Sequence, residues 1–69
     1  MIKFKDRVRL KPDTNTFRSN QRLSSAIGVV VVTRVVAGPV VAATVQFEDA
    51  RLKHIPAEDL IVERWTDRS

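Results

Sequence analysis

Residues 26–48 constrain the fold of this chain more than any other stretch does. Their sequence, AIGVVVVTRVVAGPVVAATVQFE, is rich in valine and is broken once by Gly38 and Pro39. β-Branched side chains lose rotamer freedom in a helix and pack well on a pleated surface, so this run favours strand. Glycine next to proline is typical of a turn. We therefore predict two long strands, residues 28–36 and 40–48, folded into a hairpin.

Alternating side chains predict another strand near the N-terminus. In residues 2–11 the apolar side chains share one parity and the basic side chains share the other. A period of two indicates a strand with one buried face. Asp6 interrupts the apolar parity, so we expect a kink there, then a regular strand over residues 7–11 that ends at Pro12. The inward set is Ile2, Phe4, Val8 and Leu10, and the outward set is Lys3, Lys5, Arg7, Arg9 and Lys11.

Residues 12–25 form a polar, turn-rich segment that is long for a connection in so small a domain. It contains two apolar residues, Phe17 and Leu23, and one interpretation is that both fold back and anchor the loop. The alternative is that Phe17 and its polar neighbours contact single-stranded nucleic acid by stacking, or contact a peptide. The neighbours that would join such a site are Arg18, Gln21 and Arg22.

The first valine-rich strand is apolar on both parities at residues 29–32. A strand with one face in water would alternate, so we expect both faces here to be at least partly covered. A bend at Gly28 would let both faces contribute to one core. Alternatively, a second copy of the chain covers the outer face. The candidate interface residues of such a homodimer are Val29, Val31 and Trp65.

The rest of the chain predicts two more short strands. A tight turn after residue 48 leads into a strand at residues 51–55, and we expect Ala50 to adopt the left-handed conformation that such turns usually require. On that basis Ala50→Gly would stabilise the fold by up to about 1 kcal/mol. Pro56 with acidic residues after it favours a 3₁₀ turn, and residues 60–62 form the last strand. In the second valine-rich strand, the predicted inward residues are Ala43, Val45 and Phe47, and the predicted outward ones are Thr44, Gln46 and Glu48.

Four short motifs carry a resemblance to a known class of domain. They are DRVRL at residues 6–10, GVV at 28–30, VQFED at 45–49 and PAEDL at 56–60. Together with the order of predicted elements they resemble KOW- and Tudor-like modules, which are SH3-like small barrels. The resemblance covers about residues 4–62 and implies an all-β, five-stranded SH3-like barrel with a long first loop and a 3₁₀ turn before the last strand. We therefore assign residues 1–63 to the barrel, and the charges of residues 64–69 indicate a charged tail. It also implies a role in binding RNA, DNA or a protein surface.

Basic residues are concentrated in the N-terminal third of the chain. Residues 1–25 carry seven Lys and Arg against two Asp, a net charge of +5, whereas residues 26–69 carry five against six acidic residues, a net charge of −1. A localised basic patch attracts polyanions, although Lys and Arg also keep an exposed strand soluble. We expect binding of RNA or DNA, with a protein-interaction or self-assembly module as the competing interpretation. The candidate nucleic-acid contacts are Lys3, Lys5, Arg7, Arg9, Lys11, Phe17, Arg18, Gln21 and Arg22.

The composition argues against catalysis, metal binding and a membrane location. The chain has 69 residues, no Cys and one His, so it can form neither a disulfide nor a thiolate metal site. His54 has no Ser or Cys nucleophile at motif spacing, and two glycines cannot build a phosphate loop. We expect no enzyme activity, no metal and no cofactor. Because no apolar run reaches the roughly 20 residues that span a bilayer, and no signal peptide is recognisable, we expect a cytoplasmic protein.

Overall fold

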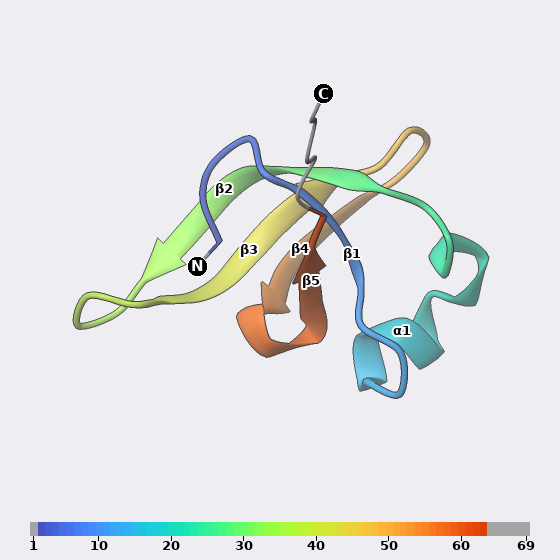
Figure 1. The fold of residues 1–69 in the computed structure, drawn as a ribbon, viewed down its shortest axis with the longest axis horizontal. Helices are drawn as coiled ribbons and strands as arrows, with labels where there is room; N and C mark the ends of the chain where they lie inside the picture. The colour runs from blue at the N-terminus through green and yellow to red at the C-terminus, as the bar shows by residue number, and fades with distance from the viewer. Residues whose placement is uncertain (1, 64–69) are drawn as a thin grey trace, which may run out of the picture.

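The computed structural model describes residues 2–63 as an all-β domain with three single short helical turns. The five strands form one antiparallel sheet in the order β4-β3-β2-β1-β5. Figure 1 shows the β2–β3 hairpin projecting to one side of the molecule, while α1 lies on the other side. The elements are β1 (Arg7–Leu10), α1 (Asn15–Ser19), η1 (Gln21–Leu23), β2 (Gly28–Val35), β3 (Val40–Gln46), β4 (Arg51–Pro56), η2 (Ala57–Asp59) and β5 (Leu60–Val62), where η denotes a 3₁₀ helix.

The short first strand connects the long hairpin to the end of the chain. β1 pairs with β2 on one side, with Arg7 opposite Val29, and with β5 on the other, with Arg9 opposite Ile61. The strands at the two edges are β4 and β5, and no ladder joins them within residues 2–63. The predicted hairpin, the predicted 3₁₀ turn and the short last strand are therefore confirmed, while closure of the sheet into a barrel stays a prediction.

The β2–β3 turn has a left-handed backbone at both of its central residues. The φ angle is 55° at Ala37 and 107° at Gly38, and the Val36 N–H donates to the Pro39 carbonyl at 3.2 Å. Positive φ at both central positions is the pattern of a type I′ turn, which matches the twist of the two strands it joins. Glycine adopts this conformation freely, whereas alanine is strained in it by its Cβ. Ala37 is therefore a locally unfavourable residue in an otherwise suitable turn.

Replacing Ala37 with glycine is expected to raise the free energy of unfolding by up to about 1 kcal/mol. Removing the left-handed strain stabilises the folded state, and this gain exceeds the loss from the extra chain entropy that glycine gives the unfolded state. In a domain of this size that gain raises Tm by about 4–8 °C. Thermal unfolding followed by circular dichroism would measure it. Ala50→Gly is the control and should lower Tm, because Ala50 is not among the residues of positive φ. A lower Tm for Ala37→Gly would contradict the prediction.

The expected left-handed conformation at Ala50 is wrong. Apart from Gly38, the described residues with positive φ are Lys5, Asp13, Ala37 and His54. The turn after β3 is closed instead by hydrogen bonds, because the Phe47 N–H donates to the Ala50 carbonyl at 2.7 Å. The Gln46 side-chain amide also donates to the carbonyls of Phe47 and Ala50, at 2.7 and 3.1 Å. A side chain thus braces the turn, and no residue in it has to adopt positive φ.

A β-bulge interrupts the apolar run of β2. Val30 lies opposite Val45 and Val32 lies opposite Thr44, so Val31 is the extra residue between two pairs. An extra residue shifts the inward parity by one, so residues on both parities of the strand sequence can face the same side. Gly28 itself serves close packing, since a Cβ there would overlap the Val45 Cγ1 atom.

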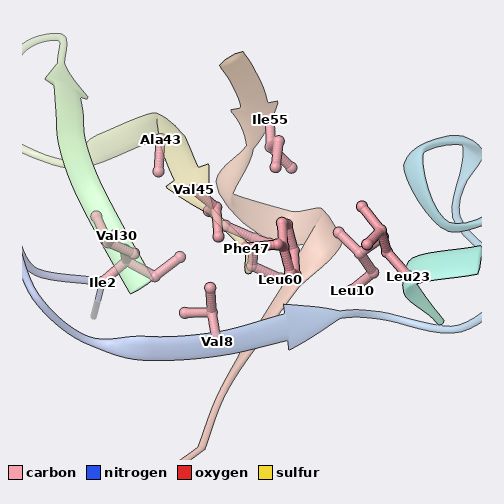
Figure 2. Close-up of a cluster of buried hydrophobic side chains, with 10 residues drawn as sticks. All are labelled: Ile2, Val8, Leu10, Leu23, Val30, Ala43, Val45, Phe47, Ile55 and Leu60. Carbon is pink, nitrogen blue, oxygen red and sulfur yellow. The ribbon is translucent and has the colours of Figure 1, made fainter. Parts of the chain in front are cut away.

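The core is formed by inward side chains from all five strands, together with Ile2, Leu23 and Phe47 from outside them, as Figure 2 shows. The inward residues predicted for β1 and β3 are confirmed, with two corrections. Phe4 is 59% exposed, because the chain turns at Lys3–Asp6, where Lys5 has a φ of 73° and the strand alternation does not apply. Thr44 was expected to face outward into solvent, but it is buried. The core residues are Ile2, Val8, Leu10, Leu23, Val30, Ala43, Val45, Phe47, Ile55 and Leu60.

The long first connection is more ordered than its composition suggested. It contains α1, whose N-cap Thr14 accepts from the Phe17 N–H at 3.2 Å, and then η1. Leu23 is buried in the core and Phe17 is half-buried against it, which confirms that both anchor the loop. A second attachment joins α1 to η2, where the Asp59 carboxylate accepts a hydrogen bond from the Thr16 hydroxyl at 2.8 Å. Two such attachments hold the loop at the end of the sheet.

Candidate nucleic-acid interface

The basic residues of β1 lie on the outer face of the sheet. Val8 and Leu10 are fully buried, so the alternation of the strand turns Arg7 and Arg9 away from the core. Arg7 is exposed and Arg9 is partly buried, and Lys11 follows the strand as an exposed residue. The outward orientation predicted for the basic residues of β1 is confirmed. It creates a short row of cations along one strand.

Glu63 modifies the charge of this row. Its backbone N–H donates to the Arg7 carbonyl at 2.8 Å, which places it beside β1 just after β5 ends. Its carboxylate forms an ion pair with the Arg9 guanidinium, diagonally across the ladder. Both side chains keep more than a third of their surface exposed, so the attraction is screened by solvent. Arg9 therefore offers a polyanion less attraction than an unpaired arginine would.

Lys3 and Lys5 lie on the turn before β1 and not on the strand itself. The turn is held by the Lys3 backbone, whose N–H donates to the Asp6 carboxylate at 2.9 Å. The Lys5 ammonium lies 5.6 Å from the centre of the Phe4 ring, within cation–π range. Lys3, Phe4 and Lys5 are all exposed. The turn thus adds two exposed cations and one exposed aromatic ring before the basic residues of β1.

The loop residues contact their own protein more than their composition suggested. Arg18 donates to the Asn15 side chain at 3.3 Å and to the Asp13 carbonyl at 3.1 Å. Arg22 forms an exposed ion pair at 3.3 Å with Asp49, which lies in the β3–β4 turn. Gln21 is exposed, whereas Phe17 is half-buried against the core. Phe17 therefore anchors the loop, and its ring is only partly accessible for stacking on a base.

An open pocket lies between the loop and the β3–β4 turn. Its volume is about 370 Å³. The Arg22–Asp49 ion pair and Glu48 lie at its polar side, and apolar residues of the core and loop form the remainder. The pocket carries two carboxylates and one guanidinium, so it is not a site for a phosphate. Its lining residues are Arg22, Leu23, Ala26, Phe47, Glu48 and Asp49.

The predicted interface residues have different surroundings. Val29 lies on the outer face and is 39% exposed, whereas Val31, the bulge residue, is only partly exposed. Trp65 lies outside the described residues. Both faces of residues 29–32 were expected to be at least partly covered. Val30 is buried and Val31 is half-buried, whereas Val29 and Val32 are 39% and 55% exposed, so the outer face is only partly covered within the single chain. Further exposed valines lie toward the tip of the hairpin, namely Val35, Val36 and Val41.

The sheet register places two polar residues beside Val29 that the sequence did not suggest as part of the candidate site. Gln46 lies opposite Val29, and Arg51 lies opposite Gln46. Directly opposed residues point to the same face, so both side chains share the outer face with Arg7. The outward parity of Gln46 was visible in the sequence, but the pairing that sets Arg51 beside it was not. Arg51 was overlooked because it lies outside the basic N-terminal third.

Within residues 2–63, no three His, Asp or Glu side chains come close enough to hold a metal ion. Across the same described part of the chain, no helix is both long and apolar enough to cross a bilayer. The described polar groups on the outer face include the guanidinium groups of Arg7, Arg9 and Arg51, the Gln46 amide and the Glu63 carboxylate. Such groups suit contact with an anion through charge and hydrogen bonding.

Comparison with protein-family models, with curated proteins and with solved structures found no match for this chain.

Proposed function

We propose that this chain is a non-enzymatic binding module that holds nucleic acid through its basic N-terminal strand and first loop. One observation carries the proposal: of the seven cations in residues 1–25, all but Arg9 are exposed, and five of the seven lie on β1 or within four residues of it. The absence of cysteine fits a cytoplasmic setting, where nucleic acids are abundant. The proposed cationic contacts are Lys3, Lys5, Arg7, Arg9, Lys11, Arg18 and Arg22.

The proposed fold class is the SH3-like barrel. Its support is the strand order β4-β3-β2-β1-β5, the long connection after β1 and the 3₁₀ turn η2 between the last two strands. These are the features on which the resemblance to KOW- and Tudor-like modules rests. In a closed barrel, the edge strands β4 and β5 would lie next to each other, in addition to the strand pairs already described.

Contact with phosphates, and not with base edges, is the proposed mode of binding. Lysine and arginine neutralise phosphates and release counterions, so affinity falls steeply as salt rises. Phosphate contacts position a nucleic acid without reading its sequence. Because Phe17 is half-buried, base stacking contributes little, and we expect similar affinities for oligonucleotides of different sequence.

Fluorescence anisotropy with labelled single- and double-stranded oligonucleotides tests the proposal. We expect binding at low salt, a linear fall of log affinity with log salt, and a slope of about −0.7 per contacted phosphate for single strands. Two unrelated sequences of equal length serve as the control for sequence independence. Absence of binding to every oligonucleotide at low salt would refute the proposal.

A specific observation also favours self-association as a second candidate function. β1 pairs with β2 only as far as Val30, where Lys5 and Asp6 complete the ladder. Beyond Val30, no segment within residues 2–63 pairs with the edge of β2 that faces away from β3. This part of the hairpin exposes Val32 and Val35 by 55% and 54%. We propose that two copies pair along this edge, because an unpaired apolar strand edge is a ready template for another strand.

Charge at the hairpin edge is expected to abolish such a dimer. In Val32→Lys/Val35→Lys, two like charges would oppose their counterparts in the second copy, so we expect a monomer where the wild type sediments as a dimer. Sedimentation velocity over a range of concentrations measures both species. The control is Arg18→Lys on α1, away from the hairpin, which should leave the sedimentation coefficient unchanged. A wild-type chain that stays monomeric at its highest soluble concentration would contradict self-association.

A further inference from the structure

Two arginines, one from edge strand β4 and one from β1 three strands away, lie in one row on the outer face of the sheet. The ladder places Arg7 opposite Val29, Val29 opposite Gln46, and Gln46 opposite Arg51. Neighbouring strands lie roughly 4.8 Å apart, so about 14 Å separates the two arginine backbones. The row contains two guanidinium groups, one amide and one valine. It runs across β1, β2, β3 and β4, nearly perpendicular to the strands.

Arg51 is held in place by Gln46. The Arg51 Nε–H donates to the Gln46 side-chain oxygen at 2.7 Å. The Gln46 amide nitrogen in turn donates to the carbonyls of Phe47 and Ala50, at 2.7 and 3.1 Å. A carbonyl oxygen can only accept, so these two carbonyls face the nitrogen of the amide, and this orientation presents the amide oxygen to Arg51. The Arg51 side chain is therefore positioned by the same residue that braces the β3–β4 turn.

The rest of the Arg51 guanidinium faces outward. The residue is exposed, and within residues 2–63 no carboxylate pairs with it. With Nε engaged by Gln46, both terminal nitrogens keep their hydrogens for a ligand. A planar guanidinium binds two oxygens of one phosphate at once, and a held side chain loses less entropy on binding. Arg18, Arg9 and Arg22, by comparison, already donate to groups of the loop or to carboxylates.

We propose that Arg51, positioned by Gln46, is a phosphate contact, and that a bound nucleic acid crosses the outer face of the sheet from Arg7 to Arg51. The inference deepens the proposed nucleic-acid function and rests on it for the identity of the ligand as a phosphodiester chain. It moves part of the binding surface from the N-terminal third to β4. Val29, between the two arginines and 39% exposed, offers apolar surface to a sugar or base.

The decisive comparison is Arg51→Gln against Arg34→Gln. Both remove one charge from an exposed strand arginine, but Arg34 lies five residues beyond Val29 along β2, about 16 Å from the row. We expect Arg51→Gln to weaken oligonucleotide binding about tenfold and to reduce the magnitude of the salt slope by about 0.7 to 0.9, the value of one phosphate contact. We expect Arg34→Gln to change affinity less than about threefold and to leave the slope unchanged.

Gln46→Ala separates positioning from charge. The variant keeps the Arg51 charge but removes its hydrogen-bond acceptor, so we expect weaker binding with the salt slope of the wild type. The NMR signal of the Arg51 Nε–H reports the hydrogen bond directly, and we expect it to broaden by exchange with water in Gln46→Ala. A sharp, unshifted Nε–H signal in this variant would show that Gln46 does not hold Arg51, and would overturn that part of the inference.

The outcomes distinguish this inference from the proposed function. If the wild type binds oligonucleotides and Arg51→Gln behaves like Arg34→Gln, Arg51 is not a contact, and the proposed function stands without it. If the wild type binds no oligonucleotide, the proposed function fails, and titration with inorganic pyrophosphate tests the anion contact alone. A pyrophosphate-induced shift of the Arg51 Nε–H signal, larger than that of Arg34, would support the contact. Equal shifts, or none, would overturn it.

Discussion

Gly28→Ala is expected to destabilise the domain by about 1–3 kcal/mol, the usual cost of forcing extra volume into a packed core. A Cβ at this position would overlap Val45 Cγ1 and lie 3.0 Å from two ring carbons of Phe47. Both neighbours are buried at the centre of the core, and valine is stiff about χ1, so neither moves away easily. In a domain of this size, the loss corresponds to a Tm lower by about 4–8 °C for each kcal/mol. Chemical and thermal unfolding would measure it.

A double-mutant cycle with Val45→Ala separates overlap from other effects of the substitution. Val45→Ala removes the overlapping atom and is destabilising alone, because it leaves a cavity. Adding Gly28→Ala to this background is expected to cost much less than in the wild type, or to stabilise by filling part of that cavity. If Gly28→Ala is as stable as the wild type, or costs the same in both backgrounds, then the close approach of β2 to Val45 is not what excludes a side chain.

Arg7→Glu is expected to weaken binding of oligonucleotides at about 0.1 M salt by at least about tenfold and to reduce the magnitude of the salt slope by about one phosphate contact. The reason is that Arg7 lies on the outer face of β1, central to the proposed cationic contacts, where a carboxylate would repel the phosphate that arginine attracts. Fluorescence anisotropy over a salt series would give both quantities.

Arg34→Glu is the matched control, because it makes the same charge change at an exposed arginine of the same sheet. It should weaken binding by less than about threefold, since exposed charges more than about 10 Å apart are largely screened at 0.1 M salt. Circular dichroism melts of both variants would show that each remains folded. Equal losses of affinity would mean that binding depends on net charge alone, and would contradict a defined site around β1.

Much of the fold was predictable because local patterns and tertiary packing agree. The valine-rich hairpin, the inward parity of β1 and the 3₁₀ turn at Ala57–Asp59 each follow from side-chain chemistry over a few residues. Leu23 was recognisable as an anchor because a large apolar side chain in a polar loop is expected to pack against the core. Two predictions failed because the local backbone does not follow the sequence pattern. Phe4 is exposed because Lys5 beside it is left-handed, and Ala50 is not left-handed because the Gln46 side chain closes its turn.

The candidate site divides in the same way. Its cations in residues 1–25 were visible as a charge asymmetry, and their outward orientation on β1 followed from the period of a strand. Which of them already have partners was not visible, because Arg9 meets Glu63 and Arg22 meets Asp49 only through long-range pairing. For the same reason Arg51 escaped notice, although the ladder sets it in line with Arg7.

The sequence by itself determined the strands, the hairpin and the positive charge of the outer face of β1. These depend on side-chain alternation and on the charges along a short length of chain. Only the tertiary structure decided the register, and with it the neighbours of each charge. Register depends on bulges such as that at Val31, and one extra residue changes every later pairing in a strand. Residues 26–48 therefore specify that a hairpin forms, whereas the folded sheet specifies which residues it brings together on the outer face.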